Sequence, residues 1–193
     1  MNKILLLTTI VFSFSLANIS YASKRPKFIK KKVVEQPTLE TVDQLDPYEY
    51  SGLWYEYARI PNSFQKNCVG NVTAIYQVLR DDCVSVKNTC LNNKGKYFTA
   101  EGNAIAKDET FAKLKVGFTK PWFTRFSSRA DYWVLELADD YSYAVVGMPS
   151  RKALWILSRT KTMNENTYQD LLNRIELNHG YKASDLVKTQ HGL

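Results

Sequence analysis

The chain has 193 residues, 45% of them hydrophobic and 13% aromatic, which suits one globular domain. The formal net charge is +7, but much of the excess lies in Lys24–Lys32, so the charge does not indicate a nucleic-acid-binding domain. The two histidines, His179 and His191, fall in the C-terminal region and no Cys-x-x-Cys pair occurs. We therefore expect neither a metal site nor a cofactor.

The N-terminus has the pattern of an export signal. Lys3 provides a basic start, residues 4–16 form an apolar run too short for a membrane helix, and Ser20-Tyr21-Ala22 is a small-x-small cleavage site. We predict a signal peptide over residues 1–22; the alternatives are a buried helix or an uncleaved anchor. Because the first cysteine is Cys68, we expect a soluble periplasmic or secreted protein without a lipid anchor.

Residues 23–46 form a basic segment with little apolar content, which predicts a flexible leader. Its basic residues, Lys24 to Lys32, would suit peripheral contact with anionic lipid, although a solvated tail is the simpler explanation and the one we favour. Asp46-Pro47 then opens the folded domain, residues 47–193.

Eight segments of alternating polarity follow, separated by turn residues, a pattern typical of a β-sandwich or β-barrel. The predicted strands are Leu53–Arg59, Val72–Leu79, Cys83–Cys90, Lys96–Ala106, Phe111–Phe118, Tyr132–Leu137, Ser142–Gly147 and Ala153–Thr160.

The strand faces indicate a dry interior with free space. Lys113 and Lys115 alternate with apolar residues, so one face of that strand is wet and the other dry. On the segment 100–106 one face carries only small side chains, namely Ala100, Gly102, Ala104 and Ala106. This predicts either a cavity inside a barrel or the close approach of another element.

In an oxidising compartment the three cysteines would form one disulfide and leave one thiol. We favour a Cys68–Cys90 bridge, because both residues lie near the far end of the hairpin that begins at Cys83.

One helix is predicted near the C-terminus. Asn164 is a good N-cap and Gly180 a good stop. We expect the helix to cover Leu154 and Ile156 on the outside of the last strand. Its apolar stripe is formed by Tyr168, Leu171, Leu172 and Ile175.

Three motifs resemble those of the lipocalin family. Residues 52–59, Gly-Leu-Trp-Tyr-Glu-Tyr-Ala-Arg, resemble its opening motif G-x-W-Y-E-x-A-R. Asp139-Asp140-Tyr141 resembles the second motif, usually Thr-Asp-Tyr, with Asp139 in place of threonine, and Arg159 resembles the third. The resemblance spans about residues 47–187 and is closest to the bacterial lipocalin and apolipoprotein D branch. It implies an all-β fold: an eight-stranded up-and-down antiparallel calycin barrel with one C-terminal α-helix packed outside.

The motif residues are expected to be structural. Trp54 would close the narrow end of the barrel, with Arg159 lying across its ring as a cation–π partner. Gly52, Asp140 and Tyr141 complete this structural set.

The resemblance implies reversible binding of a small hydrophobic ligand, which we expect to be a long-chain fatty acid or lysophospholipid carried or stored at the cell envelope. Placing Trp54 inward sets the parity of its strand, so Glu56 and Ala58 should also face inward; a one-residue slip would reverse any strand. The predicted ligand-binding residues are Ala58, Tyr76, Val86, Ala100, Ala104, Val116, Phe118, Tyr132, Val134, Val146, Trp155 and Leu157.

At the open end, basic and aromatic loop residues would form a rim. The basic residues would meet an anionic headgroup, unless they are simply solvated charges. The rim candidates are Lys66, Lys120, Arg125, Phe64, Trp122 and Phe123. The same parity places Glu136 inside near the floor, where Arg159 or tyrosines would satisfy it; a catalytic role is the weaker alternative.

Two other functional classes fit the sequence less well. A lipocalin-fold enzyme acting on a lipid would use a free cysteine, Cys83 or an unpaired Cys90, but the sequence has no Gly-x-Ser-x-Gly elbow or phosphate-binding glycine loop. An outer-membrane barrel disagrees with the charged face at Lys113 and Lys115. We therefore predict a non-enzymatic carrier that is a monomer or weak dimer.

Overall fold

The computed structural model describes residues 36–118 and 129–193. The predicted signal peptide, most of the basic leader, and the rim candidates Lys120, Trp122, Phe123 and Arg125 lie outside these residues. Within them, no helix is long and apolar enough to cross a membrane.

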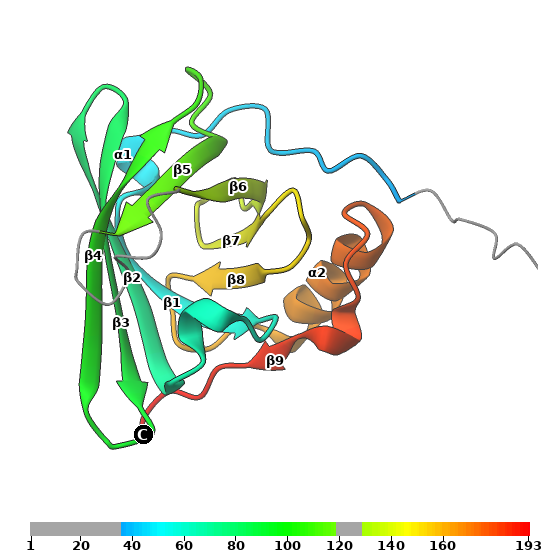
Figure 1. Ribbon diagram of the computed structural model, residues 1–193. Helices are drawn as coiled ribbons and strands as arrows, with labels where there is room; N and C mark the ends of the chain where they lie inside the picture. The colour runs from blue at the N-terminus through cyan, green and yellow to red at the C-terminus, as the bar shows by residue number, and fades with distance from the viewer. Residues whose placement is uncertain (1–35, 119–128) are drawn as a thin grey trace, which may run out of the picture. The chain divides into compact units, whose positions relative to one another are not determined.

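Eight antiparallel strands close into an up-and-down barrel, as predicted (Figure 1). Each strand pairs with the next along the chain, and β1 closes the barrel by pairing with both β2 and β8. The strands are β1 (Gly52–Arg59), β2 (Cys68–Arg80), β3 (Cys83–Asn92), β4 (Tyr97–Ala106), β5 (Lys113–Phe118), β6 (Ala130–Leu137), β7 (Tyr143–Gly147) and β8 (Leu154–Ser158).

Several short elements were not predicted. A short strand, β9 (Val187–Lys188), pairs with β1 after the 3-10 turn η3 (Ala183–Asp185). At the N-terminal side, α1 (Pro47–Tyr50) is capped by Asp46, whose Oδ1 accepts a hydrogen bond from the backbone N–H of Tyr48 at 2.7 Å.

The folded part begins earlier than the predicted boundary at Pro47. The backbone N–H of Val42 donates to the carbonyl of Val134 at 3.0 Å, and that of Leu45 donates to Thr110 at 2.8 Å. Leu45 is buried and Val42 packs against the barrel interior. The end of the segment assigned to the leader is therefore part of the barrel, because its apolar residues fill the closed end.

The predicted C-terminal helix is α2 (Glu165–Leu177), with Asn164 as its N-cap. Gly180 follows with φ +66°, a conformation that glycine adopts without strain. The helix lies outside the barrel (Figure 1). Leu171 and Ile175 of the helix pack on Leu154 and Ile156 of β8, as predicted.

Two β-bulges reverse the predicted parity at the ends of two strands. The pairing of β1 with β8 shifts between Glu56 and Ala58, and that of β6 with β7 shifts between Val134 and Glu136. An extra residue in one strand turns the following side chains to the other face. Ala58 consequently packs in the outer cluster under α2, and Glu136 reaches residues of the α2 region. Both were wrongly predicted to face inward.

Candidate functional site

The narrow end of the barrel is closed by a tryptophan beneath a guanidinium. Trp54 has no exposed surface, and its Nε1 donates to the carbonyl of Tyr50 at 2.8 Å. The Arg159 Cζ lies 3.8 Å from the centre of the indole ring, which confirms the predicted cation–π contact. The guanidinium also donates to the carbonyls of Ser51 and Leu53, both at 2.9 Å, and so ties the helix α1 region to β1.

The other motif residues hold the turns around this floor. Tyr141 has φ +56°, and its hydroxyl accepts a hydrogen bond from the backbone N–H of Asp46 at 2.9 Å. The Asp140 carboxylate accepts from the backbone N–H of Ser142 at 3.0 Å. Gly52 has φ +93°, and a Cβ there would lie 3.5 Å from the Arg159 guanidinium. The geometry agrees with a structural role for the motif.

Above the floor lies an apolar cavity with a volume of about 140 Å³. The predicted ligand-binding residues that line it are Tyr76, Val86, Ala100, Val116, Phe118, Tyr132, Val146, Trp155 and Leu157. Ala104 lies deeper, at a second space of about 20 Å³, and Val134 is fully buried in the core. Lys66 is exposed and does not line the cavity, whereas Phe64 does.

Several lining residues were not predicted, and each has a structural reason. Phe64 and Gln65 enter through the 3-10 turn η1 (Ser63–Gln65), which folds over the mouth of the barrel. Asn88 in the middle of β3, Cys90 near the end of β3 and Phe98 near the start of β4 are inward positions. Period-two alternation from Val86 points to Asn88, but a polar residue at that position did not signal an inner wall.

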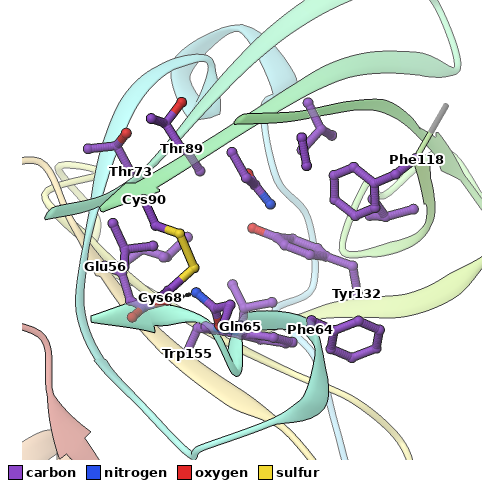
Figure 2. Close-up of a pocket in the computed structure, with 18 of the residues that line it drawn as sticks. Glu56, Phe64, Gln65, Cys68, Thr73, Thr89, Cys90, Phe118, Tyr132 and Trp155 are labelled. Atoms are coloured by element: carbon purple, nitrogen blue, oxygen red, sulfur yellow. Dashed lines mark hydrogen bonds between the residues drawn. A yellow bond between two sulfur atoms is a disulfide. The ribbon is translucent and has the colours of Figure 1, made fainter. Parts of the chain in front are cut away.

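Gln65 connects the mouth to Glu56, the one buried carboxylate among the described residues of this lining. Its Oε1 accepts from Trp155 Nε1 at 2.7 Å, and its Nε2 donates to Glu56 Oε2 at 2.5 Å (Figure 2). The other Glu56 oxygen accepts from Arg59 at 2.6 Å and from the hydroxyl of Thr189 at 2.5 Å. With its side chain 3% exposed, Glu56 is inward as predicted and is fully paired.

The predicted disulfide is confirmed. Cys68 and Cys90 are bonded, with Cα atoms 5.6 Å apart, and both line the cavity wall (Figure 2). Cys83 is the free cysteine; it is 4% exposed and lies outside the cavity lining. A buried thiol away from the cavity does not have the accessible surroundings that a nucleophile needs.

Three tyrosine hydroxyls form a chain inside the barrel, where the cavity meets the smaller space near the floor. The Tyr50 and Tyr132 hydroxyl oxygens lie 2.8 Å apart, and Tyr132 donates to Tyr76 at 3.1 Å. Figure 2 shows Tyr132 pointing into the cavity between the disulfide and Phe118. Burial raises the pKa of Tyr76 to about 12 and raises the pKa of Tyr50 and of Tyr132 well above the usual value, so all three remain neutral.

Glu136 lies on the outside of the barrel. It accepts from Arg174 at 2.7 Å and contacts His179 Nε2 at 3.2 Å, so it is satisfied by the α2 region and not by Arg159 or inward tyrosines. Among the described residues, no group of His, Cys, Asp or Glu is arranged to hold a metal ion.

Comparison with known proteins identifies the family. Residues 45–191 match the family model described as a lipocalin-like domain. Temperature-induced lipocalin-1 of Arabidopsis thaliana is 39% identical over 81% of this chain and 85% of its own length. Outer membrane lipoprotein Blc of Escherichia coli K12 is 33% identical over 77% and 81%, and apolipoprotein D of Macaca fascicularis is 31% identical over 86% of both.

Solved structures agree on the fold. Insecticyanin from Manduca sexta superposes with a TM-score of 0.65 at 23% identity, over 82% of this chain and 87% of that one. The family model, the sequence relatives and the closed barrel together show that the chain belongs to the lipocalin family, in the branch with Blc and apolipoprotein D.

Proposed function

We propose that the protein reversibly binds and carries or stores a long-chain fatty acid or lysophospholipid at the bacterial cell envelope, without chemically changing it. Lipocalins bind small hydrophobic ligands, and the observation that carries the proposal is the apolar cavity between Tyr132, Trp155 and the disulfide. Each methylene buried there contributes roughly 0.8 kcal/mol. The apolar cavity wall would provide this favourable free energy of burial, and Trp54 closes the end of the barrel opposite the mouth.

The size of the cavity sets how such a ligand would lie. A space of about 140 Å³ resembles the engineered cavity of ~150 Å³ that holds benzene, and is below the ~300 Å³ of pockets for drug-sized ligands. A long chain would therefore fill the cavity with one part and continue through the mouth past Phe64 and Phe118.

Titration with palmitate and with lysophosphatidylcholine tests the proposal. Trp155 lines the cavity and should report binding by a change in fluorescence. Ala100→Leu places a larger side chain in the cavity and should weaken binding at least tenfold. Asn103→Leu makes a similar change on the outward face of the same strand, β4, and should leave binding unchanged. If neither lipid changes the emission or the thermal stability of the wild type, the ligand assignment is wrong.

We further propose export into the periplasm as a monomer or weak dimer that has no lipid anchor. The Cys68–Cys90 bridge supports an oxidising compartment. The relative Blc is called an outer membrane lipoprotein, which supports the cell envelope as the location but differs from the proposed absence of an anchor. The intact mass of protein from a periplasmic fraction should correspond to a chain beginning at Ser23 without an acyl group. A precursor mass, or an acylated one, would contradict this. Peripheral membrane contact through Lys24–Lys32 would appear as salt-sensitive binding to anionic vesicles.

A further inference from the structure

The strand connections at the mouth of the barrel are basic. In an up-and-down barrel successive connections alternate between the two ends, so the β1–β2, β3–β4, β5–β6 and β7–β8 connections surround the mouth. Where the structure describes these connections, they contain no Asp or Glu. Their charged residues are Lys66, Lys94, Lys96, Arg129, Arg151 and Lys152. The mouth is therefore surrounded by positive charges.

The connections at the floor have the opposite character. The β2–β3, β4–β5 and β6–β7 connections, all within the described chain, contain one basic residue, Lys107. Their acidic residues are Asp81, Asp82, Asp108, Glu109, Asp139 and Asp140. Asp46 and Glu49 are exposed at the same end, where the backbone N–H of Asp46 donates to the Tyr141 hydroxyl at 2.9 Å. The barrel consequently has an electric dipole along its axis, with the mouth positive.

The lysines at the mouth do not hold the fold together. Lys66, Lys94, Lys96 and Lys152 are exposed to solvent. In the β3–β4 turn, the backbone N–H groups of Lys94 and Lys96 donate to the Asn92 side chain at 2.9 and 3.0 Å, so the turn uses their backbone and leaves their side chains outside. Like charges gathered at one end repel one another. Such a cluster is expected to bind a negatively charged partner.

Exposed apolar side chains lie among these charges. Tyr97 follows Lys96 directly and is 64% exposed, and Val69, near the start of β2, is 47% exposed. Leu91 pairs with both Gly70 and Tyr97, which places Val69 and Tyr97 near the same edge of the sheet. Tyrosine is enriched where a membrane meets water, and basic residues beside apolar ones are typical of membrane-surface binding. An acidic protein or a nucleic acid would satisfy the lysines but would gain little from Val69.

We propose that the mouth of the barrel docks on an anionic lipid membrane, with the acidic floor facing away from it. Each Lys or Arg near such a surface strengthens binding roughly fivefold, and the acidic floor opposes the reverse orientation. The apolar cavity then opens onto the headgroup layer. The docking goes beyond the proposed function, because it gives the orientation in which a lipid would be exchanged, and it rests on that function only for its purpose.

Co-sedimentation of the exported chain, from Ser23 onward, with lipid vesicles tests the docking. The wild type should bind vesicles that contain phosphatidylglycerol more tightly than vesicles of phosphatidylcholine alone. Raising the ionic strength from ~0.1 M to ~1 M shortens the Debye length from about 10 Å to about 3 Å and should remove most of this difference.

Two double variants locate the charges that matter. Lys94→Gln/Lys96→Gln at the mouth should weaken binding to the anionic vesicles about tenfold. Lys107→Gln/Lys161→Gln is the matched control, because it removes the same charge from two exposed lysines away from the mouth, and it should bind as the wild type does. Equal losses in the two variants would show that only net charge matters, and unchanged binding of the mouth variant would assign the contact to Lys24–Lys32. Either result would overturn the docking.

A fluorophore attached to an added cysteine tests the orientation. The buried Cys83 should not react with the label. A polarity-sensitive dye on Ser150→Cys, in the β7–β8 connection, should shift its emission to the blue when the protein binds anionic vesicles, whereas the dye on Gln44→Cys, which precedes the floor helix α1, should not. A blue shift at Gln44→Cys alone, or equal shifts at both sites, would contradict the proposed orientation.

Palmitate titration without vesicles separates the docking from the proposed function. Lys94→Gln/Lys96→Gln should retain the palmitate affinity of the wild type, because neither lysine lines the cavity. If vesicle binding follows the expected pattern but the wild type binds neither palmitate nor lysophosphatidylcholine, the proposed function fails and the docking stands. If palmitate binds but the mouth variant and its control bind vesicles equally, the docking is wrong and the proposed function stands.

Discussion

The barrel sheet has a packed core on each of its faces, and the two cores differ in kind. On the outside, Leu154 and Ile156 of β8 meet Leu171 and Ile175 of α2, and all four are without exposed surface. On the inside, the same strand presents Trp155 and Leu157 to a cavity. Period-two alternation thus assigns close packing to one face and ligand space to the other. Stability and binding should therefore respond to different substitutions.

The largest expected effect comes from emptying the outer core. Leu171→Ala removes a fully buried side chain from a filled region, and we expect the free energy of unfolding to fall by about 3 kcal/mol. Val86→Ala on the cavity wall should cost about 1 kcal/mol, because that side chain already borders empty space. Urea denaturation measures both values.

Ligand titration completes this comparison. Leu171→Ala should retain wild-type affinity for palmitate under conditions where it is folded, whereas Val86→Ala should change it. Equal losses of stability in the two variants would mean that the inner face is packed as tightly as the outer one.

The disulfide gives the inner face a covalent support that the outer face lacks. Cys68 and Cys90 are separated by 22 residues in sequence, and a loop of that size is stabilised by about 3 kcal/mol when closed. The Cys68→Ser/Cys90→Ser double variant should lose up to that amount in denaturation and should also bind ligand differently, because both sulfurs line the cavity. Cys83→Ala, which touches neither, should leave ligand affinity unchanged.

At the floor of the barrel, the planar shape of the Arg159 guanidinium should matter as well as its charge. Arg159→Lys retains a positive charge but loses the planar group that stacks on Trp54 and donates to Ser51 and Leu53. We expect a loss of about 2 kcal/mol in the free energy of unfolding. Lys161→Arg, beside Tyr55 at 5.8 Å, is the control and should be neutral. A neutral Arg159→Lys would show that the floor is held by packing alone.

The sequence was sufficient for the barrel, the outer helix and the floor, because each depends on periodicity or on a motif, and for the disulfide, because the predicted hairpin brought Cys68 and Cys90 to the same end. A β-bulge adds one residue to a strand and leaves no mark in the sequence alternation of polar and apolar residues. Ala58 and Glu136, which follow such bulges, were therefore predicted on the wrong face of the sheet. Gln65 enters the site through a turn that folds back over the mouth, and such long-range placement has no local signature. Asn88 shows the other limit: a polar residue on a strand identifies an inner wall only after the register is known.

The smallest effect concerns the charge pair on the outer face. Burial opposes the charged form of Glu136, but hydrogen bonds with His179 and Arg174 outweigh it and hold the pKa of Glu136 below its usual value of 4.5. A lowered pKa means that the unfolded chain takes up the proton first as the pH falls. The contribution is therefore present above pH 4.5 and is lost as the pH falls through the folded-state pKa.

Since Glu136 is partly exposed, solvent screening limits this contribution to well under 1 kcal/mol, or about 1–2 °C in Tm. Glu136→Gln should lower Tm by this amount at pH 7 and by progressively less as the pH falls below 4.5, whereas Glu101→Gln at the exposed Lys87 contact should have no effect over the same range. A Tm difference that grows on acidification would mean that the carboxylate is destabilised on the outer face. The outer face would then carry a destabilising charge, and it would differ from the cavity side of the sheet only in how closely its side chains pack.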